Sequence, residues 1–191
     1  MSVYSGAVFL HVVGALGLFA SIGVEQASLG SLRRAHSNAQ VREWVAVLGG
    51  LRRVDAPSGI LILVTGFYMM ATRWGQQAWI GLALLGIVAM VVIGIAGTGR
   101  RVNAIRKSVP VVDGPVSAAL RDRLNDRVLL VAASLRAAIG LGIVFNMTVK
   151  PNAVGALTAM GVAVVVGAVA ALVRSPSSGR VVPVDHNEAR V

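Results

Sequence analysis

The sequence contains no cysteine, which excludes disulfide bonds, thiolate metal sites and cysteine nucleophiles. Charged residues are also scarce: they make up 14% of the 191 residues, whereas soluble domains carry roughly a quarter. Hydrophobic residues make up 55%, and the mean hydropathy is +0.75. This surplus of apolar side chains indicates a protein whose outer surface faces lipid rather than water.

Motifs that carry catalytic chemistry are missing as well. The sequence has no carboxylate pair, no Ser–His–Asp arrangement, no phosphate-binding loop and no HExxH helix. We therefore assign no catalytic residue and expect a non-enzymatic accessory or scaffold subunit of a membrane assembly. Its expected partners are the lipid bilayer and other membrane subunits or further copies of the chain. A stripe of small residues supports such packing, and it comprises Ala159, Ala163, Gly167 and Ala171.

Five apolar stretches predict transmembrane helices, because a helical span needs about 20 mostly apolar residues. The stretches are 3–24, 56–72, 77–98, 128–149 and 152–173. The first has no basic segment before it, so we expect a retained span rather than a secretory signal. The sequence thus predicts an all-α polytopic bundle over residues 1–173. The polar tail, residues 174–191, is expected to be disordered and cytoplasmic.

An amphipathic helix is predicted near residues 38–52, ahead of the second span. Ser37 and Gln40 have the spacing of a capping box, which favours a helix start. Apolar residues then recur at helical spacing, with arginines around them. The apolar residues are Trp44, Val47, Leu48 and Leu51, and the flanking basic residues are Arg42, Arg52 and Arg53. We expect this helix to lie in the membrane interface, against lipid head groups. After the turn at 113–115, Leu120, Leu124 and Val128 predict one unbroken helix into the fourth span.

Basic residues fall mainly in three segments. Of the 18 Lys and Arg residues, 15 lie in 30–55, 99–127 and 174–191, which five spans place on one side of the membrane. The positive-inside rule then predicts an outer N-terminus and a cytoplasmic C-terminus. The pI of about 11.7 is explained by this topology. We expect no nucleic-acid binding, because aromatic residues are few and are not interleaved with the basic ones. Anionic lipid head groups suit the same charges.

Arg136 is the one basic residue inside a predicted span, about 12 Å from its start. An arginine at that depth costs about 2.5–3.5 kcal/mol on insertion scales. Its neighbours one turn away include Ala132, Ala133 and Gly140, and small residues mark close helix contacts in membranes. We therefore expect Arg136 to face the interior of the bundle.

A buried arginine requires an acidic partner. Of the eight acidic residues, Glu25 and Asp55 are the two that adjoin other spans at the right level, so we predict a Glu25–Arg136 pair with Asp55 as the second partner. The simplest interpretation is a packing ion pair that sets the register of the bundle. An anionic head-group or substrate site remains open, as does a pathway for protons or small solutes.

His11 lies eight residues in from the predicted outer surface. Met69, Met70 and Met147 end the second and fourth spans on that same side. A haem or copper site formed by these residues is therefore geometrically possible, since imidazole and thioether groups bind both. The alternative is a packed histidine hydrogen-bonded to a neighbouring helix, with methionine as filler.

Three segments of the first half carry a resemblance. They read "FLHVVGALGLFASIG", "RRVDAPSGILILVTGFYMM" and "RWGQQAWIGLALLGIV". In them the chain resembles uncharacterised bacterial integral-membrane proteins related to copper-resistance protein D and, more distantly, to the J-type protoporphyrinogen oxidase. The resemblance implies a helix bundle of the bacterial inner membrane. In the better-known relatives a first-span histidine is associated with metal or haem, and His11 is the matching position. A haem- or copper-binding membrane protein centred on His11 is thus the alternative to the scaffold.

Overall fold

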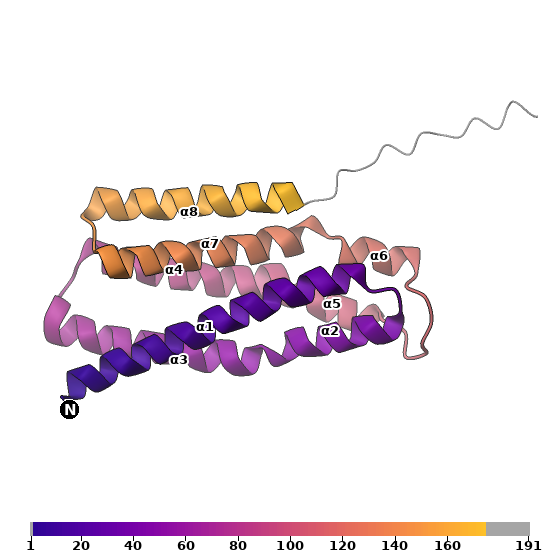
Figure 1. Cartoon of the computed structure of the whole chain (residues 1–191), viewed down its shortest axis with the longest axis horizontal. Coiled ribbons are helices and arrows are strands. Elements are labelled where there is room, and N and C mark those ends of the chain that lie inside the picture. Colours follow the sequence, from indigo (N-terminus) through magenta and orange to yellow (C-terminus); the bar gives the residue numbers. More distant parts are fainter. Residues whose placement is uncertain (1, 175–191) are drawn as a thin grey trace, which may run out of the picture.

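The computed structural model describes residues 2–174, and within them the chain is helical, with one isolated bridge and no strand. Five helical stretches are long and apolar enough to cross a membrane, which confirms the predicted all-α bundle (Figure 1). They are Val3–Arg34, Asn38–Trp74, Ala78–Ser108, Ala118–Val149 and Ala153–Arg174. The predicted disordered tail lies outside the described residues, apart from Arg174.

Several of these stretches are composed of more than one element. The elements are α1 (Val3–Arg34), α2 (Asn38–Gly50), α3 (Arg52–Met69), the π-helical turn η1 (Met70–Trp74), α4 (Ala78–Ile93), the π-helical turn η2 (Gly94–Gly99), α5 (Arg100–Ser108), α6 (Ala118–Leu124), α7 (Arg127–Val149) and α8 (Ala153–Arg174). The second span is therefore longer than the predicted 56–72, because α3 follows α2 directly and η1 extends it.

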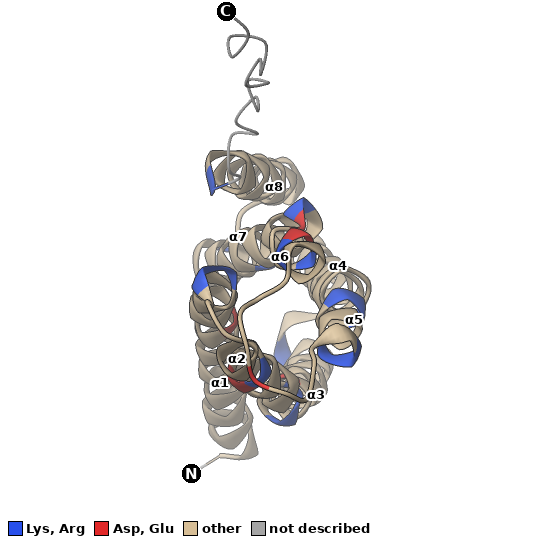
Figure 2. Ribbon diagram, turned by 90° about the vertical axis from the view of Figure 1, so that its right-hand side faces the viewer, with Lys and Arg blue, Asp and Glu red and all other residues tan. Residues whose placement is uncertain are grey.

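The bundle is built around α7, which packs on α8, α4, η2 and α1. α1 in turn packs along α3, while α8 lies on the outside against α7 and α4. No extended backbone contact joins α3 to α4, and each of these helices packs mainly on another partner. In Figure 2, α1 and α3 lie on one side of the view down the bundle and α4 and α5 on the other.

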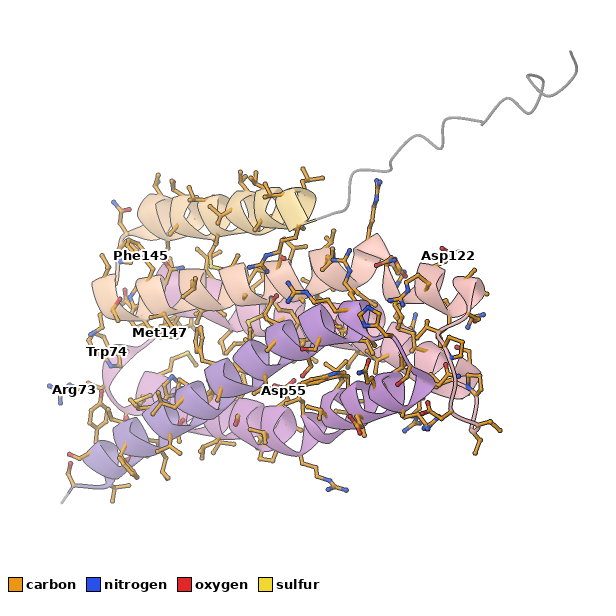
Figure 3. All side chains as sticks on the ribbon, turned by 45° about the vertical axis from the view of Figure 1, so that its right-hand side comes forward. Asp55, Arg73, Trp74, Asp122, Phe145 and Met147 are labelled. Carbon is orange, nitrogen blue, oxygen red and sulfur yellow. The ribbon has the colours of Figure 1, made fainter. Side chains whose placement is uncertain are left out.

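The two ends of the bundle differ in composition. One end carries α2, α5, α6 and most of the arginines, and we call it the basic end (Figures 1 and 2). The opposite end carries Tyr4, Trp74 and Trp79, and we call it the aromatic end. There the Trp74 indole N–H donates to the Tyr4 hydroxyl at 3.0 Å, and the rings of Trp74 and Trp79 meet edge to face. Figure 3 shows Trp74 and Met147 at this end and Asp122 at the other.

The helix α2 packs on the protein along a face that overlaps the predicted one. Val41, Val45 and Leu48 are buried in the core of the basic end, and Trp44 and Leu51 pack against it. Of the predicted apolar face, Val47 is exposed. The predicted cap is present in extended form: the Ser37 hydroxyl accepts from the Gln40 N–H, and the Gln40 side chain accepts from the His36 N–H.

The fourth span is interrupted, contrary to the prediction of one unbroken helix. α6 ends at Leu124, and α7 begins at Arg127. Asp126 lies at the break, where its carboxylate accepts from the Val128 N–H at 2.9 Å and caps α7. A second oxygen of Asp126 accepts from Arg101 Nε at 2.7 Å. The cap and this ion pair are stronger local signals than the apolar periodicity across the break.

The predicted small-residue stripe is used inside the chain. Ala163, Gly167 and Ala171 of α8 are buried. A Cβ on Gly142 would lie 3.0 Å from the Cβ of Ala163, which shows how closely α7 and α8 approach. The valines and leucines on the rest of α8 are exposed, as expected for a surface that faces lipid.

Candidate functional site

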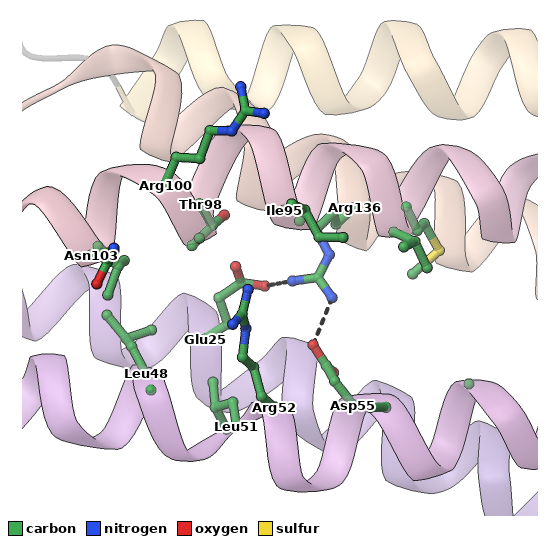
Figure 4. Close-up of a pocket in the computed structure, with 18 of the residues that line it drawn as sticks. Glu25, Leu48, Leu51, Arg52, Asp55, Ile95, Thr98, Arg100, Asn103 and Arg136 are labelled. Carbon is green, nitrogen blue, oxygen red and sulfur yellow. Dashed lines mark hydrogen bonds and ion pairs between the residues drawn. The ribbon is translucent and has the colours of Figure 1, made fainter.

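Arg136 joins three helices inside the bundle through two ion pairs. From α7 it donates through Nη1 to the carboxylate of Glu25 on α1, and through Nη2 to Asp55 on α3 at 3.0 Å (Figure 4). The structure thus brings together the three residues that the sequence analysis grouped. The side chains of Arg136 and Glu25 are 9% and 5% exposed, and that of Asp55 is 27% exposed.

Glycine and alanine make room for this cluster. A Cβ on Gly94 of η2 would lie 3.2 Å from Nε and 3.3 Å from Cζ of Arg136, so the guanidinium rests against bare backbone. Ala132 and Ala133, one turn before Arg136, are buried. A Cβ on Gly97 would approach the Cβ of Ala132 to 2.5 Å. The small residues therefore let η2 and α7 meet closely enough to hold the arginine.

A cavity of about 680 Å³ lies beside the cluster, toward the basic end. Its walls come from α1, α2, α3, α4, η2, α5 and, through Arg136, α7, and Figure 4 shows polar side chains that line it. We call it the basic cavity. Its charged and amide- or hydroxyl-bearing lining residues are Glu25, Arg52, Asp55, Thr98, Arg100, Asn103, Arg106 and Arg136. Most of the remaining lining residues are apolar, so the charged side chains of the cavity are set among hydrophobic walls.

The charges in the basic cavity do not balance. Four arginines line it against two carboxylates, and Arg136 engages both carboxylates. Within residues 2–174, Arg52 and Arg100 form neither an ion pair nor a side-chain hydrogen bond. Figure 4 shows Arg52 extending from α3 toward the Arg136 cluster. In the same figure Arg100 points away from that cluster, and both arginines are exposed, so their guanidinium groups are available to an anion at the edge of the cavity.

Two buried polar atoms of the cluster also lack protein partners in the described part of the chain. These are Oδ1 of Asp55 and Nε of Arg136. Buried polar atoms in proteins are nearly always hydrogen-bonded to protein, water or ligand. A donor and an acceptor at the cavity wall thus remain for water or for a bound molecule.

A second pocket, of about 240 Å³, lies at the aromatic end. We call it the aromatic pocket. His11, Met69, Met70 and Met147 all line it, so the structure brings together this predicted group as well. Most of the other lining residues are apolar or aromatic, and Lys150 stacks over the Trp74 ring at 4.1 Å.

The proton on His11 can be assigned from its neighbours. Thr65 Oγ1 lies 2.9 Å from His11 Nδ1 and 2.5 Å from the carbonyl oxygen of Leu61. The hydroxyl has one proton, which it donates to the carbonyl, so it accepts from Nδ1–H of the histidine. His11 is therefore held in the tautomer whose Nε2 carries a lone pair.

This donor set fits a soft metal ion better than haem. An imidazole nitrogen and thioether sulfurs are suitable ligands for Cu(I), and metal-bound histidines usually donate their other N–H. Within residues 2–174 no group of three or more His, Asp or Glu side chains could hold a metal. His36 lies at the opposite end of the bundle, so a haem with two histidine ligands does not fit these residues.

The predicted interfacial residues have separate positions. Trp44 packs against the core of the basic end, and Arg42 Nη1 donates to the Pro110 carbonyl at 2.8 Å. Arg52 and Arg53 are both exposed, and of the two only Arg52 lines the basic cavity. Sequence reasoning missed Arg100 and the other cavity residues of η2 and α5. The available signal was that Gly94 and Thr98 lie one turn apart on the same face, just before Arg100.

Comparison with known proteins identifies no relative of this chain. No protein-family model, no curated protein and no solved structure matches the chain. The resemblance to proteins related to copper-resistance protein D therefore stays a prediction, and the fold and the two hollows are what the chain offers for inferring its function.

Proposed function

We propose that this protein is a non-enzymatic binding protein of the membrane whose basic cavity takes an anionic group of the phosphate class. The observation that carries the proposal is the pair Arg52 and Arg100, which line a 680 Å³ cavity without an acidic partner in the described chain. In the predicted orientation this cavity faces the cytoplasmic half of the bilayer. The accessory-subunit role predicted from the sequence is compatible with such binding.

The chemistry of the cavity favours an anion. Guanidinium groups bind phosphate oxygens through two parallel hydrogen bonds, and their charge is permanent. Arg136 is not the anchor, because Glu25 and Asp55 already occupy its Nη atoms. Arg52 and Arg100 are both exposed, so an anion can reach them.

The test is a binding titration on purified full-length protein in detergent. Glycerol 3-phosphate and inorganic phosphate are the probes, and glycerol is the neutral control. Removing two charge-assisted contacts, each of about 1.5–3 kcal/mol, should weaken binding in Arg52→Gln/Arg100→Gln at least tenfold. Arg34→Gln/Arg53→Gln is the matched control, because it removes the same charge from exposed arginines that do not line the cavity. Equal affinities in the two double variants would overturn the proposal.

A soft metal ion in the aromatic pocket is the second candidate. It is favoured by the fixed tautomer of His11 and by the three methionines that line the same pocket. His11 Nε2 and one or more sulfurs would hold Cu(I), which would supply redox or metal-transfer chemistry. Metal analysis of protein purified with and without Cu(I) tests it. Stoichiometric copper that is lost in His11→Ala supports this candidate, and protein that remains metal-free after purification with Cu(I) rejects it.

A further inference from the structure

We infer that the occupant of the basic cavity is an anionic lipid whose acyl chain runs between α3 and α4, past Ile87, into the aromatic pocket. This inference rests on the proposed function, because it assigns the phosphate to a lipid head group. The basic cavity and the aromatic pocket both include Ile87 in their lining. They are therefore adjacent hollows, with the side chain of Ile87, which is buried, between them.

One face of α3 lines both hollows in succession. The residues that line the basic cavity are Arg52, Asp55, Ala56 and Gly59, and those that line the aromatic pocket are Ile62, Gly66, Phe67 and Met69. Most of the steps between them are three or four residues, and the shorter steps at 55–56, 66–67 and 67–69 broaden the face but keep it on one side of the helix. From Arg52 to Met69 the face extends about 26 Å, close to the ~30 Å thickness of a bilayer core.

α4 and η2 also line both hollows, and they do so in the opposite chain direction from α3. Their residues in the aromatic pocket include Ile80, Leu84 and Ile87, and their residues in the basic cavity include Ile87, Val91, Gly94, Ile95 and Thr98. Two helix faces therefore oppose each other over the length of a span. α3 and α4 share no extended backbone contact, so the acyl chain of this proposal would lie between their side chains.

Polarity along this space matches an amphiphile. The basic end holds the arginines, and the stretch around Ile62, Leu84 and Ile87 is apolar. In the aromatic pocket, His11 satisfies its Nδ1–H with Thr65, and Lys150 stacks on Trp74. Nothing lies within 4 Å of a Cβ added at Gly59, whereas the space over Gly66 is taken by the His11 imidazole, 3.4 Å from such a Cβ. A free phosphate would use the basic cavity and leave this apolar continuation without a role.

The experiment uses photolabelling of the full chain in vesicles. The probe is phosphatidylglycerol with a diazirine at the end of one acyl chain, and phosphatidylcholine with the same chain is the neutral control. After irradiation, mass spectrometry locates the label. We expect it in the aromatic pocket, at Met69, Met70 or Leu84, and at least fivefold above the label from phosphatidylcholine. Arg52→Gln/Arg100→Gln should reduce this pocket labelling to the phosphatidylcholine level, whereas Arg34→Gln/Arg53→Gln should retain it.

The outcomes separate the two proposals. If glycerol 3-phosphate binds through Arg52 and Arg100 but the label falls only on lipid-facing residues such as Leu85, the acyl-chain inference is wrong and the proposed function stands. If neither the binding of glycerol 3-phosphate nor the labelling by the lipid depends on these arginines, the proposed function and the acyl-chain inference are both wrong.

Copper and an acyl chain would compete for the same pocket, so pocket labelling that Cu(I) leaves unchanged also argues against the metal candidate. Ile87→Trp, which narrows the passage, should lower pocket labelling at least fivefold, with Leu85→Trp on the exposed side of α4 as its control.

Discussion

Arg136 and Glu25 are 111 positions apart in the sequence, and their side chains form an ion pair that is more than nine-tenths buried. Asp55 adds a second carboxylate to the same guanidinium. The pair therefore connects α7 to α1, and the second carboxylate connects both to α3. An ion pair shared by three helices depends on all of them being in place.

The first prediction concerns the loss of that arginine. Arg136→Met leaves Glu25 and Asp55 buried or half-buried without a cation, so the free energy of unfolding should fall by about 3–5 kcal/mol. Unfolding in mixed detergent and SDS micelles measures it. Arg101→Gln is the control: its pair with Asp126 is 34% exposed on each side, and its loss should cost at most about 1 kcal/mol.

The combined variant tests the cause. Neutralising the carboxylates as well, in Glu25→Gln/Asp55→Asn/Arg136→Met, should recover most of the lost stability. A simple exchange of the charges of residues 25 and 136 should not, because it would place a carboxylate at 136 against Asp55. Equal stability of Arg136→Met and Arg101→Gln would show that the buried cluster contributes little.

The second prediction concerns the contact between η2 and α7. Gly97→Ala would bring a Cβ to 2.5 Å from the Cβ of Ala132, so the helices must separate, at a cost of about 1–3 kcal/mol. The thermal unfolding midpoint in detergent should fall. Ala132→Gly should restore it in the double variant. Gly161→Ala is the control: nothing lies within 4 Å of its added Cβ, and alanine favours a helix. A Gly97→Ala protein as stable as Gly161→Ala would contradict the close contact.

The third prediction concerns His11. Thr65→Val removes the acceptor for Nδ1–H, so stability should fall by about 0.5–1.5 kcal/mol, the range of hydrogen bonds between membrane helices. Nitrogen NMR of labelled histidine should show the proton on Nδ1 in the native protein and a changed signal in Thr65→Val. Thr65→Ser should keep it, as should Thr72→Val, whose hydroxyl bonds only within its own helix. A proton found on Nε2 in the native protein would overturn the assignment.

The fourth prediction concerns orientation in the membrane. The absence of cysteine means that single cysteines can be introduced without changing the background. Under the positive-inside rule, Ser37→Cys and Ser117→Cys at the basic end should react with an impermeant maleimide only after the cells are opened. Thr72→Cys at the aromatic end should react in intact cells. The reverse pattern would place the basic cavity on the outer side.

Much of the fold could be predicted because a membrane restricts the choices. Long apolar stretches must be helices in lipid, so the number of spans follows from the sequence. The grouping of Arg136 with Glu25 and Asp55 was accessible for a similar reason. With eight acidic residues in the chain and few near the spans, elimination left two.

The basic cavity could not be predicted in this way. It exists because α3 packs on α1 while α4 packs on α7, and pairing between distant helices has no local signal. The break at Asp126 was missed because a side-chain cap and an ion pair to Arg101 outweigh a regular apolar spacing. The apolar side of α2, expected to face lipid, packs on protein instead, and Val41 and Val45 take the place of Val47 in its buried face.

The position of Arg136 late in the chain also bears on how the protein is made. α7 leaves the ribosome after α1 and α3, so both carboxylates that neutralise its arginine are already in the bilayer when it arrives. The free-energy cost of placing an arginine in the bilayer is therefore lowered by carboxylates on helices that were synthesised earlier. Biogenesis should follow the order of synthesis, with α7 held at the translocon until it docks on α1 and α3. A chain whose first span is replaced by a neutral one should stall at that step.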